Sequence, residues 1–243
     1  MLVQASVKDV SGDGLGALSE EVVACRLCPR LVAWREKVAL ERRAAYGSEQ
    51  YWGRPVPGFG DPNARLLVVG LAPAAHGGNR TGRMFTGDRS GDWLWEALWR
   101  AGLANQPKSR DRGDGLQAQG AWVTAAVKCA PPGNKPNSVE RDNCFSHLER
   151  ELAYLSSVKA VLALGAFAYG ASCRLLGVRP RPRFGHGAEV RAEDGRSIVC
   201  SYHPSQQNTF TGRLTAEMLS SVVERAWQLA SCSGGNELPT TSS

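Results

Sequence analysis

Short runs of consecutive apolar residues alternate with longer amphipathic segments along most of the chain. Strands that are buried on both faces give continuous apolar runs, whereas helices that cover a sheet show a period of 3.6 residues. The alternation therefore predicts a single α/β domain with a parallel sheet. We expect strands over residues 65–69, 121–127, 158–164 and 197–202, and helices over residues 92–102, 138–155, 166–177 and 214–230.

The two ends of the chain lack this pattern. Residues 1–18 contain Gly, Ser and Asp without an apolar period, and residues 233–243 are polar, so we expect both to be disordered around a domain over residues 19–232. Residues 19–43 are typical of a helix that starts at Ser19 and is interrupted at Pro29. Asp194 and Gly195 predict a hairpin before the last strand, and residues 104–120 a surface loop.

Length and composition are those of an ordinary globular domain. The chain has 243 residues, 42% of them hydrophobic and 21% charged, which excludes wholesale disorder and fibrous structure. The longest uncharged apolar stretch, residues 160–173, is too short for a bilayer-spanning helix, so no membrane association is expected. The N-terminus lacks the features of a secretory signal, and we expect a cytoplasmic protein.

The net charge is modestly basic. Lys and Arg number 29 against 23 Asp and Glu, giving +6, and the sequence pI is about 9.1. This balance favours a polyanionic partner, but many basic enzymes bind no nucleic acid, so the charge leaves both possibilities open.

Four of the seven cysteines show a spacing suggestive of a metal site. Cys25 and Cys28 form a Cys-x2-Cys pair, Cys129 closes a predicted strand, and Cys144 falls in the next helix. In a reducing compartment such cysteines indicate metal binding more often than disulfides. Four thiolates suit zinc or an iron–sulfur cluster, and the spacing does not separate the two; Cys129 and Cys144 as small core residues remain the alternative.

Polar side chains follow three of the four predicted strands and would share one crevice. Asp88 lies near a predicted helix start, where it complements the helix dipole or takes part in chemistry. His203 directly follows a strand and is either a proton donor or acceptor or a satisfied core group. Asn134 is a turn residue or a ligand-binding one, and Phe85 fills the core or offers a stacking face.

The long loop after the first strand, GLAPAAHGGNRTGRMFTGD over residues 70–88, is rich in glycine. Glycines before a helix can bind phosphate through backbone amides. The loop matches neither the Walker A nor the dinucleotide pattern, so no nucleotide cofactor is expected.

This loop, together with KCAPPGNKP (residues 128–136) and SYHPSQQNTFTGR (residues 201–213), resembles the uracil-DNA glycosylase superfamily. The long first motif and the four cysteines look like its type-B branch, also called family 5. The resemblance extends from about Cys25 to the last helix. It implies an α/β/α sandwich of three layers around a four-stranded, mainly parallel sheet, and a monofunctional enzyme that removes uracil from DNA.

The resemblance also assigns roles to particular residues. Asp88 matches the acidic residue that assists the attacking water, Asn134 the residue beside the base, and His203 the histidine that reaches the uracil carbonyl. Phe85 matches the ring on which the base stacks, with Gly70 and Ala72 also at the base. Cys25, Cys28, Cys129 and Cys144 would hold a structural 4Fe-4S cluster, with zinc as the alternative.

Contacts to DNA are expected from basic and amide groups near the crevice. Arg80, Arg83, Lys135 and Arg213 are candidates for phosphate contacts, although each could also be solvated surface. The segment with Asn208 and Arg213 resembles the loop that enters the DNA where the base leaves. We expect a monomer whose partner is DNA carrying uracil or other deaminated bases such as hypoxanthine or xanthine.

One departure from the wider superfamily concerns the residues after the first-strand glycine. Many branches carry an acidic or amide residue there, whereas Leu71 and Ala72 are apolar, so water activation would pass to Asp88. The small side chains of Ala72, Ala74 and Ala75 suggest room for bases larger than uracil.

Two other functional classes explain less of the sequence. A non-catalytic nucleic-acid-binding module with a structural metal site made of four cysteines explains the charge and the cysteines, but not the polar residues after the strands. A zinc deaminase, which pairs a zinc-ligand histidine with a glutamate in an H-x-E arrangement, is the other class, and we do not adopt it.

Overall fold

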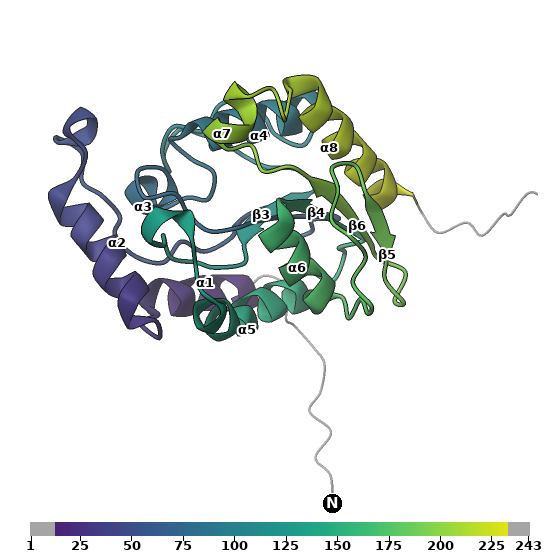
Figure 1. The fold of residues 1–243 in the computed structure, drawn as a ribbon, viewed down its shortest axis with the longest axis horizontal. Helices are drawn as coiled ribbons and strands as arrows, with labels where there is room; N and C mark the ends of the chain where they lie inside the picture. Colours follow the sequence, from purple (N-terminus) through teal and green to yellow (C-terminus); the bar gives the residue numbers. More distant parts are fainter. Residues whose placement is uncertain (1–12, 233–243) are drawn as a thin grey trace, which may run out of the picture.

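A mixed sheet of six strands forms the centre of the domain (Figure 1). The computed structural model describes residues 13–232, and the sheet order is β1-β3-β2-β4-β6-β5. The four central strands are parallel and correspond to the four predicted ones: β2 (Leu66–Gly70), β3 (Ala121–Ala125), β4 (Ala160–Leu164) and β6 (Ser197–Ser201). The antiparallel edge strands β1 (Phe59–Gly60) and β5 (Glu189–Arg191) correct the expected number of four to six.

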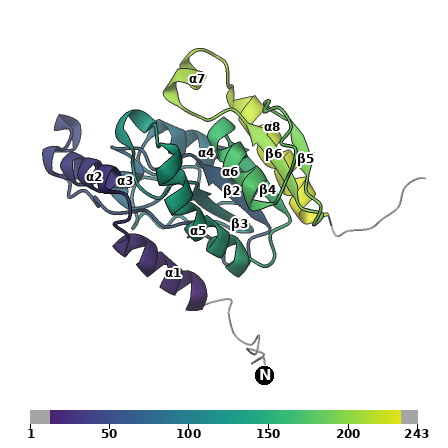
Figure 2. The same ribbon diagram turned by 60° about the horizontal axis from the view of Figure 1, so that its bottom comes forward.

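Helices cover both faces of the sheet, so the expected layering is confirmed (Figures 1 and 2). Leu66 and Val68 of β2 join the core beneath α4 (Arg89–Arg100) and α8 (Ala216–Ser231). Leu67 and Val69 point to the other face, beneath α5 (Ser138–Tyr154) and α6 (Ala166–Leu175). Because successive side chains of a strand alternate, a continuous apolar run serves both layers.

The N-terminal helix begins earlier than expected. Helix α1 (Asp13–Ala24) includes residues 13–18, which the sequence pattern assigns to a disordered end. Leu15, Leu18 and Val22 are buried at helical spacing and α1 packs against α5, which explains the order. Ser19 is therefore not an N-cap but an interior residue whose hydroxyl donates to the Leu15 carbonyl at 2.8 Å. Residues 1–12 and 233–243, expected to be disordered, lie outside the described residues.

Helix α2 (Pro29–Glu41) starts at the proline that was expected to interrupt a helix. Proline suits the first turn because its missing N–H would have no partner there. The remaining helices are short: η1 (Ala44–Tyr46), α3 (Gly78–Thr81), η2 (Pro132–Asn134) and α7 (Gln206–Phe210). The predicted hairpin before the last strand is confirmed by the antiparallel pairing of β5 with β6. Across residues 13–232, none of the helices has the length and apolar character needed to cross a membrane.

Candidate active site

A cleft of about 560 Å³ lies at the carboxyl ends of the central strands, where the loops after β2, β3 and β6 meet. Parallel sheets place ligand sites at this edge, because the strands all end there. The cleft brings together Phe85, Asp88, Asn134 and His203, which the sequence had placed after different strands. The remaining lining residues are Leu71, Ala72, Pro73, Ala74, Met84, Arg89, Ser90, Gly133, Ser205, Gln206 and Gln207.

The Phe85 ring forms one wall of the cleft. Neighbouring residues fix both this ring and the Phe85 backbone. Its backbone has a φ of 49°, a left-handed conformation that is rare for a bulky side chain. A Cβ on Gly70 would lie 2.6 Å from Phe85 Cζ, so the ring packs directly on the end of β2. The Phe85 carbonyl accepts a hydrogen bond from Trp95 Nε1 at 2.8 Å and touches Gly91 of α4. Gly70 therefore supports the aromatic wall and does not itself line the cleft.

His203 follows β6 and lies beside this ring, with the two ring centroids 6.1 Å apart and their planes inclined by 30°. A Cβ on Gly165 would come within 3.3 Å of His203 Cβ, which shows how closely the β4–α6 turn approaches. Burial lowers the pKa of His203 to about 4. The imidazole is therefore neutral at pH 7, with one N–H to donate and one nitrogen to accept.

Asp88 is the N-cap of α4. Its Oδ1 accepts a hydrogen bond from the Gly91 N–H at 2.9 Å, so the capping role that the sequence left open is present. The other carboxylate oxygen, Oδ2, lies against the backbone of Gly77, where a Cβ would collide with it. Burial raises the pKa of Asp88, and the amides of Gly91 and Ser90 oppose this shift. One helix start therefore fixes the carboxylate without using both of its oxygens.

Asn134 reaches the cleft from η2, in the loop that follows β3. Gly133 and Asn134 both have positive φ, 58° and 55°, which forms a tight turn after Pro131 and Pro132. The side chain of Asn134 is exposed and makes no hydrogen bond to another described residue. Its amide is free to bind a ligand.

Several lining residues were not predicted. Met84 precedes Phe85, and Gln206 and Gln207 begin α7 at the rim. Arg89 follows Asp88, and its guanidinium stacks over the exposed Phe210 ring, 4.4 Å from the centroid. Their place inside the quoted motifs, or next to one in the case of Arg89, is the only signal the sequence offered for them.

Two predicted DNA contacts, Arg80 and Arg83, bond to other residues inside the protein. Arg80 bonds to the carbonyls of His76 and Gly87 and pairs with Glu49. Arg83 donates to Asp114 at 2.7 Å, and also to Ser109 and Thr86. Both side chains are buried and bonded to partners inside the protein, so we withdraw them as phosphate contacts. They instead hold the long loop after β2 in shape.

The other predicted contact residues lie nearer the surface. Lys135 and Arg213 are exposed, and the Arg213 guanidinium lies 4.5 Å from the centroid of the Tyr202 ring. The Asn208 side chain donates to the His203 carbonyl at 2.8 Å. Asn208 thus ties α7 to the strand end that carries His203, a positioning contact that the sequence did not indicate.

The four motif cysteines line a second, separate cavity between the N-terminal helices and the sheet. Three of their sulfurs accept hydrogen bonds: Cys129 from Arg35 Nη1 at 2.8 Å, Cys144 from the Lys128 amide at 3.2 Å, and Cys28 from Asn143 Nδ2 at 3.6 Å. Burial raises the pKa of Cys129 to about 11 and of Cys144 to about 12. Such thiols become thiolates at neutral pH when a bound metal displaces the proton.

The cysteines surround the cavity and do not converge on one point. Within residues 13–232, no three His, Cys, Asp or Glu side chains are placed so that they could hold one metal ion. Ala72 packs against this cysteine cluster and also lines the active-site cleft. The loop after β2 therefore contacts both sites.

Comparison with known proteins identifies the family of this chain. The family model described as the uracil DNA glycosylase superfamily matches residues 57–228. The type-5 uracil-DNA glycosylase of Mycobacterium leprae is 53% identical over 223 residues, 89% of this chain and 97% of the relative. That of Mycobacterium tuberculosis is 52% identical over 223 residues, covering 89% and 83%. That of Thermus thermophilus is 51% identical over 215 residues, covering 88% and 97%. The match confirms the resemblance seen in the sequence motifs, and the chain belongs to the type-5 branch of the uracil-DNA glycosylase superfamily.

Proposed function

We propose that this chain is a DNA-repair glycosylase that hydrolyses the bond between uracil and deoxyribose in DNA and leaves an abasic site. The observation that carries the proposal is the meeting of Phe85, Asp88, Asn134 and His203 in one cleft of a chain that belongs to the type-5 family. Each of these side chains has a task that base excision requires.

Recognition of the base falls to an aromatic face and an amide. A glycosylase takes the base out of the stack, so its pocket needs a stacking surface and hydrogen bonds to the Watson–Crick edge. Phe85 supplies the surface, and its fixed backbone keeps the ring in place. Asn134 supplies an amide that can donate and accept toward the base edge.

His203 stabilises the departing base. Breaking the N-glycosidic bond places negative charge on the base, and a donor already aimed at the carbonyl oxygen stabilises that charge as it develops. With a pKa of about 4, the imidazole is neutral and acts by donating a hydrogen bond, not by transferring a proton.

Asp88 acts on the sugar side of the bond. Positive charge develops on the sugar, and a nearby carboxylate stabilises it and orients the attacking water. The Gly91 amide holds Oδ1, which leaves Oδ2 for water. Because Leu71 and Ala72 offer no polar side chain, Asp88 is the carboxylate within the cleft that can take this role.

The cysteine cavity would hold a 4Fe-4S cluster on Cys25, Cys28, Cys129 and Cys144. Four thiols around a cavity suit a cluster of several irons better than one zinc ion, whose four sulfur ligands lie about 2.3 Å from a single point. Hydrogen bonds from Arg35, Lys128 and Asn143 would stabilise the thiolates. When bound, the cluster ties α2 and the α1–α2 turn to the sheet and serves a structural purpose.

The proposal also covers deaminated bases larger than uracil. Ala72 and Ala74 line the cleft with small side chains, which leaves space for hypoxanthine and xanthine as well as uracil. Excision from duplexes that carry each base tests this range, and release of uracil alone would contradict it.

Lys135 and Arg213 remain the proposed phosphate contacts at the rim.

The central test uses a labelled duplex with one uracil opposite guanine. The duplex is incubated with the 243-residue chain and abasic sites are then cleaved with alkali. A strand break at the uracil is expected. DNA binding without a break for any deaminated base would favour the non-catalytic module instead.

A further inference from the structure

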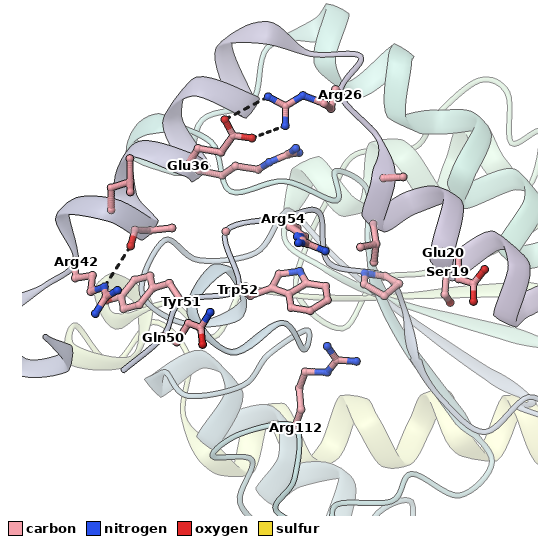
Figure 3. Close-up of a pocket in the computed structure, with 17 residues that line it drawn as sticks. Ser19, Glu20, Arg26, Glu36, Arg42, Gln50, Tyr51, Trp52, Arg54 and Arg112 are labelled. Carbon is pink, nitrogen blue, oxygen red and sulfur yellow. Dashed lines mark hydrogen bonds and ion pairs between the residues drawn. The ribbon is translucent and has the colours of Figure 1, made fainter. Parts of the chain in front are cut away.

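A third hollow of the described structure is distinct from the cleft and from the cysteine cavity. It is a groove of about 970 Å³ between α1, α2 and the segment of residues 50–57, closed on one side by Arg112 (Figure 3). Five arginines and two glutamates line it. The groove therefore carries an excess of positive charge around a mostly aromatic and aliphatic floor.

Two of these arginines are held in place without an acidic partner. Figure 3 shows the Trp52 indole between the guanidinium groups of Arg54 and Arg112, which lie 5.7 Å and 4.6 Å from the ring centroid. Both side chains are exposed, and neither forms a hydrogen bond or ion pair with another residue between 13 and 232. By contrast, Arg26 in the same groove is neutralised by Glu36.

The indole that orders them is itself fixed. Trp52 Nε1 donates to the Pro55 carbonyl at 2.9 Å, and the Trp52 backbone N–H donates to the Arg80 carbonyl at 2.9 Å. The ring packs on Gly82, where a Cβ would come within 2.9 Å of the indole. Stacking on a rigid ring orders a guanidinium while its five N–H donors stay free.

The groove is attached to the catalytic loop. The segment at Trp52 is bonded to α3, and the same loop continues through Met84 and Phe85, which line the cleft. The segment that lines the groove at Trp52 is thus hydrogen-bonded to the loop that supplies a wall of the cleft.

We propose that Arg54 and Arg112 form a second contact region for DNA, in which their guanidinium groups bind phosphates of the strand that extends beyond the flipped base. Arginine forks match phosphate geometry, and the chain already binds this polyanion in the cleft, so the inference rests on the proposed glycosylase function. An acidic protein segment is the competing occupant, and the test below separates the two.

The test measures binding as a function of salt. The probes are a short duplex of about 10 base pairs, roughly one helical turn, and a long duplex of about 30, each with a non-hydrolysable 2′-fluoro-deoxyuridine at its centre. For the long duplex, the double variant Arg54→Gln/Arg112→Gln should reduce the slope of log K against log salt by about 2, or about 1 for each arginine. Affinity should fall roughly tenfold at moderate salt, with little change for the short duplex.

Two further variants keep the result interpretable. Arg54→Lys/Arg112→Lys restores the charge and should recover most of the slope. Lys159→Gln removes an exposed cation at the start of β4, the opposite end of the strands from the cleft, and should leave both duplexes unaffected. Circular dichroism confirms that each variant is folded.

Several outcomes would overturn the proposal. An unchanged slope with the long duplex would mean that the groove binds no DNA and would favour the acidic protein segment. Equal weakening of the binding of both duplexes would mean that the two arginines contact the same short stretch of DNA as the cleft. Uracil excision by the wild-type chain in either case would leave the proposed function standing, whereas its absence would refute that function separately.

Discussion

Replacing His203 by alanine tests whether a neutral imidazole acts on the base. Burial lowers the pKa of His203 from 6.5 to about 4, a difference that corresponds to about 3 kcal/mol of unfavourable charging in the folded protein. At pH 6 an ordinary histidine would be about three-quarters protonated, whereas His203 should be about 1% protonated. The proposed hydrogen-bond donor is therefore present across the whole neutral range.

The assay follows the imidazole carbon and proton resonances of the chain by NMR between pH 8 and pH 5. The chain has four histidines, and the resonance lost in His203→Ala identifies the relevant one. That resonance should stay at its neutral position throughout. The direction of the linkage also follows: because the unfolded chain takes up a proton that the folded chain refuses, stability falls as the pH drops from 6.5 toward 4.

Activity gives the second half of this prediction. Loss of one aimed donor typically costs about 3 kcal/mol, so His203→Ala should slow single-turnover uracil release at least roughly a hundredfold while the fold is retained. The wild-type rate should show no inflection near pH 6.5. A His203 resonance that titrates near 6.5, or a variant with the wild-type rate, would refute the reasoning.

Three further predictions concern the carboxylate, the aromatic wall and the cysteines. Asp88→Asn should lower the single-turnover rate roughly a hundredfold with unchanged stability, because asparagine also caps helices, whereas Asp88→Ala should lose about 1 kcal/mol in chemical denaturation as well. Equal rates for wild type and Asp88→Asn would exclude a role for the charge. Gly70→Ala places a Cβ 2.6 Å from Phe85 Cζ and should therefore displace the aromatic ring. Binding of a uracil duplex should weaken roughly tenfold, since stacking on an aromatic ring is worth about 1–3 kcal/mol per base. Gly16→Ala, with open space at its Cβ, is the control. Cys144→Ser should lower the iron content and the melting temperature, whereas Cys232→Ser, outside the cysteine cavity, should not; full iron content in Cys144→Ser would contradict the ligand assignment.

The central fold was predictable because it depends on local apolar runs. Each central strand is a stretch of consecutive buried residues, and its position was found to within a few residues. Strand β1 has only two residues and exists because it pairs with β3, so no local pattern announces it. Helix α1 does carry the spacing of Leu15, Leu18 and Val22, but Gly14 and Gly16 weaken its helical signal.

The site was predictable where a residue directly follows a strand, and not where distant partners decide its role. Asp88, Asn134 and His203 meet because parallel strands end at the same edge. The sequence predicts Arg80 and Arg83 as phosphate contacts, because both are basic residues near the crevice. Their acidic partners Glu49 and Asp114 lie 31 positions away in each case, and only the folded chain brings them together. The contact between Trp52 and Arg112 could not be predicted from the sequence for the same reason.

Phe85 shows why glycines are needed at the start of the first motif and in the first turn of α4. A left-handed phenylalanine costs free energy, on the order of 1–3 kcal/mol, and persists only where its surroundings fix it. Gly70 lets the ring reach the strand end, Gly91 lets the carbonyl approach α4, and Trp95 bonds that carbonyl. The same turn places Asp88 three residues later at the helix start. One loop conformation therefore determines both the backbone strain at Phe85 and the position of the Asp88 carboxylate. A substitution that relaxes Phe85 should also displace Asp88.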